Sequence, residues 1–292
     1  MKRELYYLFS NISLIRIKRR VSVDSKVPIQ VQSFLNEYLS LFENQIPNTL
    51  DALYLHGSIA LHAYIEGSSD IDFIAVVNRS LTESDVKIIS DLHEKLNQKY
   101  KKTVMDGCYL LDKDFGKKQS EIKNCLYVNE GKTKWSNDCT NPITWWILKN
   151  KGITIKGSDV TTLVFNVDES ILIEYVLENM NTYWLNRLKT IKKYKTIALL
   201  LPNKFVDMEV EWSITGMLRQ FYTLRECDIV SKVDASKYAI NHIPERWHNL
   251  IKEAISIREG LNIRYYKSKK QRIDDTIQFM NYILDACNNI EK

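Results

Sequence analysis

The sequence predicts an α/β (α+β) first half followed by an all-α helical bundle. Helical and strand-like patterns alternate over residues 29–111, whereas only helical periodicity recurs after about residue 166. The chain has 292 residues and 45% hydrophobic content, which is enough for two ordinary domains with separate cores. We therefore expect an N-terminal extension, a first domain and a helical domain over residues 1–28, 29–165 and 166–292.

The elements of the first half follow from apolar spacing and from helix-start and helix-stop signals. Pro47 ends a run of apolar residues at helical spacing. Thr82 is a suitable N-cap for the second helix, with Asp85 three residues further on. Short apolar runs bounded by turn residues or helices predict the strands. We expect helices over 29–46 and 82–98, and strands over 50–55, 70–77 and 103–111.

The second half shows five segments with helical periodicity. The last of them carries an apolar stripe that runs from Ile273 to Ile290. Such a series of amphipathic helices indicates a bundle that buries the stripes against one another. We expect these helices over 170–192, 206–227, 232–242, 245–259 and 269–290.

Composition excludes several classes of protein. A net charge of +5, from 41 basic and 36 acidic residues, is too mild to indicate nucleic-acid binding. The N-terminus lacks the pattern of a signal peptide, and no apolar run approaches the roughly 18 residues of a membrane span. We expect a cytoplasmic monomer that binds neither nucleic acid nor membranes.

The cysteines suggest a reducing compartment. They are odd in number, scattered, and form no C-x-x-C pair. We therefore expect reduced thiols and neither a disulfide framework nor a zinc site. The positions are Cys108, Cys125, Cys139, Cys227 and Cys287.

Two acids on the second expected strand indicate a metal site. Asp70 and Asp72 are two residues apart and therefore project to the same face, while Ile71 and Phe73 point to the other. Neighbouring carboxylates repel unless a cation lies between them, and oxygen ligands suit Mg²⁺. The alternative is a surface strand edge whose charges prevent aggregation.

The context of these acids favours phosphate chemistry. The preceding strand ends at Gly57-Ser58, where glycine lets the backbone approach a phosphate and serine adds donors. Asp106 lies inside the third, otherwise apolar strand, which is costly unless it has a partner. Three carboxylates beside a phosphate-holding turn predict metal-assisted phosphoryl or nucleotidyl transfer.

This arrangement, Gly57-Ser58 followed by Asp70-Ile71-Asp72 and then Asp106 on a later strand, resembles the nucleotidyltransferase superfamily of DNA polymerase β type. The resemblance covers roughly residues 30–160 and implies a mixed sheet. It also implies that Ser69 lies at the nucleotide.

The helical half resembles the C-terminal domain of the bacterial aminoglycoside adenylyltransferases that modify streptomycin and spectinomycin. The resemblance rests on residues 217–247, with Arg219, Ile229, Ser231-Lys232 and Ile243-Pro244 in the family's register. It implies AMP transfer from ATP, with Mg²⁺, to a hydroxyl of an aminoglycoside-type drug, releasing pyrophosphate.

The resemblance also implies roles for individual residues. Asp70 and Asp72 hold the metal, and Asp106 acts as general base or as a further metal ligand. Glu209 corresponds to an acid that faces the drug. Spectinomycin is favoured over streptomycin, because our alignment puts Leu200 and Phe205 where a Trp and an Asp support streptomycin binding. The residues that contact the nucleotide are Gly57, Ser58, Ser69, Arg219 and Lys232.

Other interpretations remain open at this point. The same fold serves nucleotidyltransferases that transfer AMP to a protein partner, as antitoxins do. The chain could also bind nucleotides or nucleic acid without catalysis, through the basic residues 16–20 and 267–272. Arg219 could simply pair with Glu211 or Glu226 on a helix surface.

Overall fold

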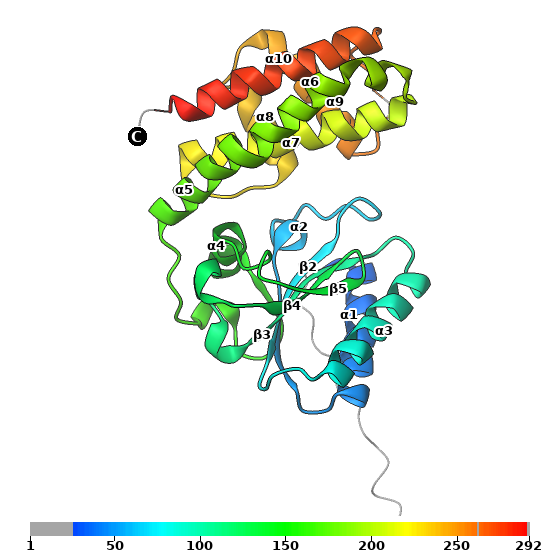
Figure 1. Cartoon of the computed structure of the whole chain (residues 1–292), viewed down its shortest axis with the longest axis vertical. Helices are drawn as coiled ribbons and strands as arrows, with labels where there is room; N and C mark the ends of the chain where they lie inside the picture. The colour runs from blue at the N-terminus through cyan, green and yellow to red at the C-terminus, as the bar shows by residue number, and fades with distance from the viewer. Residues whose placement is uncertain (1–25, 262, 291–292) are drawn as a thin grey trace, which may run out of the picture.

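The computed structural model describes residues 26–261 and 263–290 in two stacked parts, a sheet part and a helical part (Figure 1). The predicted fold class is confirmed, since a mixed sheet is followed by a helical region. Most of the expected N-terminal extension, 1–28, lies outside the described residues. No helix in the described ranges is long and apolar enough to cross a membrane.

The sheet has six strands in the order β5-β4-β3-β2-β1-β6. Strands β2 and β3 are parallel, and the other neighbours are antiparallel. The predicted edge-strand alternative for the two acids is wrong, because β2 lies between β3 and β1. The strands are β1 Leu50–Leu55, β2 Ile71–Val77, β3 Met105–Leu111, β4 Cys125–Asn129, β5 Lys132–Ser136 and β6 Ile153–Lys156.

Helices cover both faces of the sheet. One face packs against α1 (Ile29–Gln45) and α3 (Glu83–Lys99), and Phe73 is fully buried there. The other face packs against Trp145 and Leu148 of α4 (Pro142–Lys151). The alternation predicted for β2 is confirmed, since Ile71 and Phe73 both point into the first of these cores.

Local signals set the helix ends as expected in the first half. Thr82 and Asp85 form a capping box at the start of α3, with each side chain bonded to the other residue's backbone N–H. Helix α1 stops at Gln45, two residues before Pro47. A short helix, α2 (Gly57–Ala60), follows β1 and turns the chain toward β2.

The hairpin β4–β5, helix α4 and strand β6 were not predicted. The hairpin turns on Glu130 and Gly131, both with positive φ (50° and 76°), which is the geometry of a tight two-residue hairpin loop. Helix α4 starts at a recognisable signal, the N-cap Asn141 followed by Pro142. These elements are short, and their apolar spacing alone does not separate helix from strand.

The helical part consists of packed helices around the buried rings of Trp184, Phe221, Trp247 and Phe279. A π-helical turn at Met180–Trp184 joins the first two helices. All five predicted helical segments are present, although the first is divided at this turn. The helices are α5 Glu169–Asn179, α6 Leu185–Leu200, α7 Asn203–Glu226, α8 Lys232–Ile240, α9 His248–Arg258 and α10 Lys269–Asn288.

Contacts of α5 and of the loop between α7 and α8 join the parts. Leu172 and Val176 of α5 belong to the core of the sheet part, although α5 lies beyond the expected boundary at residue 165. Asp228, in the loop between α7 and α8, accepts bonds from Nζ of Lys151 (2.7 Å) and Nε1 of Trp146 (3.1 Å). Helix α4 of the sheet part therefore holds the loop that leads into α8.

The expectation of reduced, unpaired cysteines is wrong for Cys108 and Cys139, which form a disulfide. They lie far apart in the sequence, on β3 and in the loop between β5 and α4, but the fold brings them together. Sequence spacing could not reveal this, because β4 and β5 were not predicted. Cys125, Cys227 and Cys287 are free thiols.

We predict that Gly216→Ala destabilises the helical part. An ideal Cβ at Gly216 would lie 2.5 Å from Cη2 of Trp184, so the indole must move. Alanine is favoured over glycine in a helix by about 1 kcal/mol, but overpacking costs about 1–3 kcal/mol. We expect the free energy of unfolding, measured in urea, to fall by about 1–2 kcal/mol.

The matched control places the same substitution in a Trp184→Phe background, which removes the outer ring of the indole. There, Gly216→Ala should be neutral or stabilising. An equal loss of stability in both backgrounds would show that the indole is not the cause.

Candidate active site

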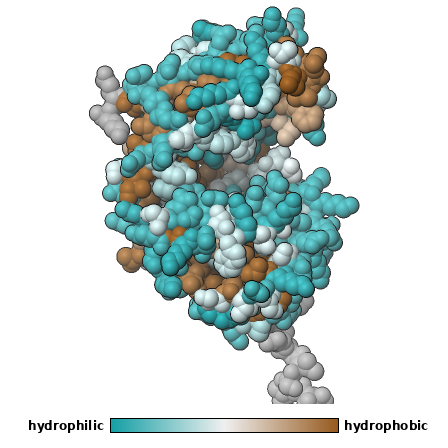
Figure 2. Space-filling view, in the orientation of Figure 1, coloured by the Kyte–Doolittle hydropathy of each residue, from teal (hydrophilic) through white to brown (hydrophobic). Residues whose placement is uncertain are grey.

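A cleft of about 430 Å³ lies between the sheet part and the helical part. The notch between the two parts is visible in Figure 2. Its floor comes from α2, the start of β2 and the start of α4, and its roof from α7, α8 and α9. Of the sequence-predicted site residues, the cleft is lined by Gly57, Ser58, Ser69, Asp70, Asp72, Arg219 and Lys232.

Asp70 and Asp72 share this cleft as predicted. Burial, followed by the charges of Asp106 and Asp72, raises the pKa of Asp70 to about 6. Burial also raises the pKa of Asp72 to about 6, against the opposing effects of the Ser58 backbone N–H and the Arg219 charge. Two carboxylates that ionise reluctantly are typical of a site that gains a cation.

The turn at Gly57-Ser58 is shaped around Asp72. Gly57 has φ +60°, and a Cβ there would lie 1.8 Å from Oδ2 of Asp72, so only glycine fits without displacement. The backbone N–H of Ser58 donates to the Asp72 carboxylate. The buried Oγ of Ser58 has no hydrogen-bond partner within the described ranges, so it can bind a ligand.

Asp106 lies on β3 directly opposite Asp72 on β2. Its Oδ2 accepts from Nδ2 of Asn129 (3.0 Å), and its Oδ1 accepts from the backbone N–H of Glu130 (2.8 Å). Burial raises the pKa of Asp106 despite these two bonds. The β4–β5 hairpin therefore positions this carboxylate, which keeps lone pairs for a metal or a proton.

Ser69 is buried at the cleft wall, but its hydroxyl is already used. Its Oγ accepts from the backbone N–H of Ile65 (3.1 Å) and closes the loop that leads into β2. In this structure Ser69 supports the position of Asp70.

Arg219 and Lys232 approach the carboxylates from the helical part. The Asp72 charge acts on the largely desolvated guanidinium of Arg219. Lys232 follows the N-cap Ser231 at the start of α8, whose N-terminus lines the cleft and favours anions. Burial lowers the pKa of Lys232 to about 8.

Two charged residues in the cleft were missed as site residues: Arg258 at the end of α9, and Glu211 on α7. Oε1 of Glu211 lies 3.0 Å from Nη1 of Arg258 and 3.5 Å from Nζ of Lys232. Glu211 and Arg219 are eight residues apart, about two turns along α7. This helical spacing from Arg219 is the sequence signal that could have identified Glu211. The expected alternative, an ion pair of Arg219 with Glu211 or Glu226, is not formed among the described residues: Glu211 pairs with Arg258 and Lys232, and Glu226 accepts a bond from Tyr238.

Glu209 does not line this cleft. It lies in a neighbouring, mainly apolar cavity of about 490 Å³, where the Arg187 guanidinium binds both its oxygens (2.8 and 2.7 Å). Glu211 and Trp212 line both cavities, and Nζ of Lys232 lies 4.3 Å from the Trp212 ring centroid. The two cavities are therefore neighbours with a common wall.

These residues fit a divalent cation and a polyphosphate. The cleft combines the carboxylates of Asp70 and Asp72, the unpartnered Oγ of Ser58 and a concentration of positive charge opposite them. Oxygen ligands suit Mg²⁺, and cations with a helix N-terminus suit phosphate. The cations are Arg219, Lys232 and Arg258.

Comparisons with known proteins agree with this fold. Residues 207–282 match the family model described as "Aminoglycoside adenylyltransferase, C-terminal domain". The crystal structure of spectinomycin adenyltransferase AAD(9) from Enterococcus faecialis, with ATP and spectinomycin, has a TM-score of 0.60 and 18% sequence identity. The match covers 87% of this chain and 98% of that chain. A comparison with curated proteins finds no match.

The structural match shows that this chain and the spectinomycin adenyltransferase share a fold. The family model spans residues 207–282, from within α7 to within α10, so this part of the chain is similar to the C-terminal domain of the aminoglycoside adenylyltransferases, as the sequence resemblance indicates.

We predict that Gly57→Ala disrupts the site more than the fold. The new Cβ must displace the Asp72 carboxylate, in addition to a backbone strain of about 1–2 kcal/mol. We expect affinity for ATP in the presence of Mg²⁺ to fall about tenfold or more, equivalent to ~1.4 kcal/mol. Calorimetric titration measures this loss.

Gly260→Ala is the matched control, because Gly260 has φ +70° and nothing within 4 Å of an added Cβ. Both variants bear the same kind of strain, so both should lose similar stability in urea. Equal losses of ATP affinity would contradict the specific role of Gly57.

Proposed function

We propose that the protein transfers AMP from ATP to a hydroxyl of an aminoglycoside-type antibiotic, requires Mg²⁺ and releases pyrophosphate. Spectinomycin is the favoured acceptor over streptomycin. The observation that carries the proposal is the single cleft in which Asp70 and Asp72 face Arg219, Lys232 and Arg258. The match of residues 207–282 to the adenylyltransferase model supports the same reaction.

In this proposal, Asp70 and Asp72 hold the metal. Bound Mg²⁺ would neutralise charge on the phosphates and let both carboxylates ionise. The chain's own groups bind the rest of the nucleotide: the backbone at Gly57 approaches a phosphate closely, and the Ser58 hydroxyl donates to one. Arg219, Lys232 and Arg258 stabilise the charge of the pyrophosphate as it leaves.

Asp106 has two possible roles, general base or further metal ligand. As a base, it would take the proton of the acceptor hydroxyl on a lone pair not used by Asn129 or Glu130. The raised pKa of Asp106 makes it a better proton acceptor than an exposed aspartate. A base of this kind contributes about 10²–10⁴-fold to the rate.

The acceptor would lie toward the second cavity, because Glu211 and Trp212 connect it to the nucleotide cleft. Glu209 is the proposed acid for a cationic drug, although Arg187 holds both its oxygens in this structure. Phe205, at a position where streptomycin recognition uses an acid, lines the same cavity. An apolar group there supports spectinomycin over the more highly charged streptomycin.

The decisive experiment is pyrophosphate release by the purified protein with ATP and Mg²⁺. It would be run against spectinomycin, streptomycin and other aminoglycosides, with Asp72→Asn as the control. Turnover with spectinomycin that is lost in the control is the expected result. ATP binding without turnover of any drug would contradict the proposed acceptor and direct the search to protein acceptors.

We predict that Glu211→Gln strengthens ATP binding. Glu211 is the present counter-ion of Lys232 and Arg258, and its negative charge repels a triphosphate that approaches them. Removal of this charge should lower the Kd for ATP about tenfold, or ~1.4 kcal/mol. Calorimetry without acceptor measures this effect.

Glu209→Gln on the same helix is the matched comparison, because Glu209 lies outside the nucleotide cleft. It should leave the Kd for ATP unchanged and raise the KM of the acceptor. Weaker ATP binding in Glu211→Gln would mean that Glu211 serves to position the cations.

We predict that ATP affinity declines as pH rises through about 8. Lys232 is charged below its pKa of about 8 and neutral above it, so its attraction for phosphate is lost on the alkaline side. Lys232→Arg keeps the charge throughout this range and should remove most of the alkaline decline. An equal decline in both proteins would exclude Lys232 as its source.

A further inference from the structure

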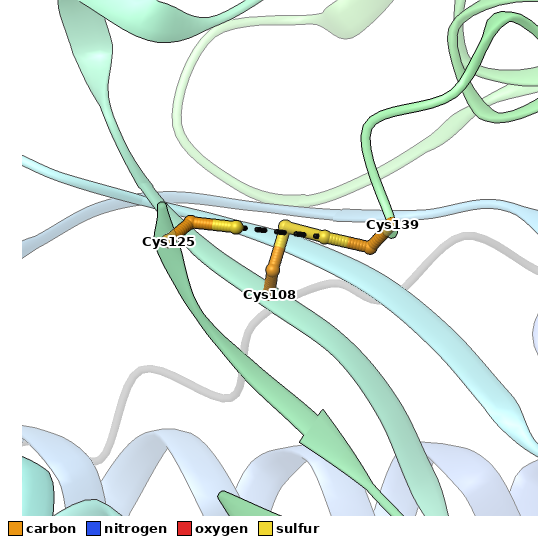
Figure 3. A group of neighbouring side chains, drawn as sticks. All are labelled: Cys108, Cys125 and Cys139. Carbon is orange, nitrogen blue, oxygen red and sulfur yellow. Dashed lines mark hydrogen bonds between the residues drawn. A yellow bond between two sulfur atoms is a disulfide. The ribbon is translucent and has the colours of Figure 1, made fainter. Parts of the chain in front are cut away.

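Three cysteines from separate segments lie close together on the face of the sheet that packs against α4 (Figure 3). Their sulfur atoms all lie within 4.8 Å of one another, and all three side chains are buried. Cys108 and Cys139 form the disulfide, and Sγ of the free Cys125 lies 3.7 Å from Sγ of Cys139. None of these residues has a part in the proposed nucleotide chemistry.

Rigid elements hold the cluster in place. Cys108 is in the middle of β3, and Cys125 begins β4, its antiparallel neighbour. Cys139 lies in the loop between β5 and α4. Thr140 and Asn141 bond back to this loop, through the carbonyls of Asn137 (2.8 Å) and Asp138 (3.2 Å). The sulfur atoms therefore converge because of the fold itself.

The donor set is purely sulfur. Within the described ranges, this is a group of three residues whose ligand atoms all converge closely enough to hold an ion, and it contains cysteines alone. Thiolate ligands favour soft ions such as Cu(I) and Zn²⁺ over Mg²⁺. The apolar surroundings, including Ile74, Ile122 and Trp145, exclude water and hard ligands.

The surroundings of Cys125 keep its sulfur protonated until a metal binds. Burial raises the pKa of the Cys125 thiol to about 12, and the charges of Asp138 and Asp114 add to this effect. Without such an ion, Cys125 stays a neutral thiol that donates to the carbonyl of Ser136 (2.8 Å).

We propose that Cys108, Cys125 and Cys139 form a binding site for a soft, thiophilic metal ion that opens when the disulfide is reduced. A dithiol reductant supplies two electrons and two protons to the disulfide and is itself oxidised to a disulfide. The three thiols then lose three protons as three metal–sulfur bonds form. The oxidised chain offers Cys125 alone and does not hold the ion.

The cysteine cluster is connected to the cleft by short stretches of the chain. Cys108 is two residues after Asp106 on β3 and points to the same face of the sheet. Cys139 is two residues before Asn141, the N-cap of α4 and a wall residue of the cleft. Either the disulfide or a bound ion ties β3 to the start of α4.

Cd²⁺ titration of the full-length chain tests the proposal, with binding followed by the ultraviolet charge-transfer absorption of Cd²⁺–thiolate bonds. The chain is reduced with a phosphine, which is removed anaerobically. We expect one Cd²⁺ per reduced chain and none per oxidised chain. Cys125→Ala should weaken binding by more than about 100-fold, because loss of a group that only supports a ligand already costs about 10- to 100-fold.

Cys287→Ala is the matched control, since Cys287 is a buried free cysteine in the helical core. It should bind Cd²⁺ like the natural chain. The proposal is overturned if the reduced chain binds no Cd²⁺, if the oxidised chain binds it equally well, or if Cys287→Ala loses as much affinity as Cys125→Ala.

A second measurement needs no variant and so does not depend on a variant's folding. Alkylation of each cysteine in the reduced chain is followed by mass spectrometry with and without Cd²⁺. At about 100 times the Kd, Cd²⁺ should slow alkylation of the three clustered cysteines about 100-fold. The partly exposed Cys227 is the internal reference; equal slowing at Cys227, or no slowing at the cluster, overturns the proposal.

Discussion

The carboxylate of Asp72 lies against the backbone of Gly57 and accepts the N–H of Ser58, and this contact determines the geometry of the whole site. It fixes the distance between the α2 turn and the start of β2. Parallel pairing of β2 with β3 then sets Asp106 opposite Asp72, and the β4–β5 hairpin holds Asp106 in turn. A small-residue turn and three strands thus place the carboxylates without any help from the helical part.

The helical part contributes the opposite charge. Its cations are desolvated in the cleft, and Glu211 forms ion pairs with two of them, Lys232 and Arg258. Buried charges of one sign are tolerated only with compensation, so the nucleotide and Glu211 compete for the same partners. The bond network of Asp228 with Lys151 and Trp146 keeps the start of α8, and therefore Lys232, facing the sheet part.

Much of this arrangement could be predicted from the sequence. Strand alternation put Asp70 and Asp72 on one face, and the helix expected over 232–242 placed Lys232 at a helix start, where the structure has Ser231 as the N-cap. Arg258 escaped prediction because it enters the cleft from the end of α9, a relation that no local spacing encodes. The disulfide escaped for the same reason: its cysteines are separated by a hairpin too short to be recognised from apolar periodicity. Glu209 was singled out by resemblance, but its bidentate bond to Arg187 could not be predicted. This bond depends on how α6 packs on α7.

The path of the chain from Glu169 to Leu200 has a mechanical consequence. Leu172 and Val176 anchor its first helix in the sheet part, while Trp184 and Leu188 anchor the rest in the bundle. One continuous helical segment therefore connects the two parts, and they are not joined by a flexible linker. Any change in the width of the cleft must bend this helical segment. The π-helical turn at Met180–Trp184, with its wider hydrogen-bond spacing, lies between the two anchored ends and is the natural hinge.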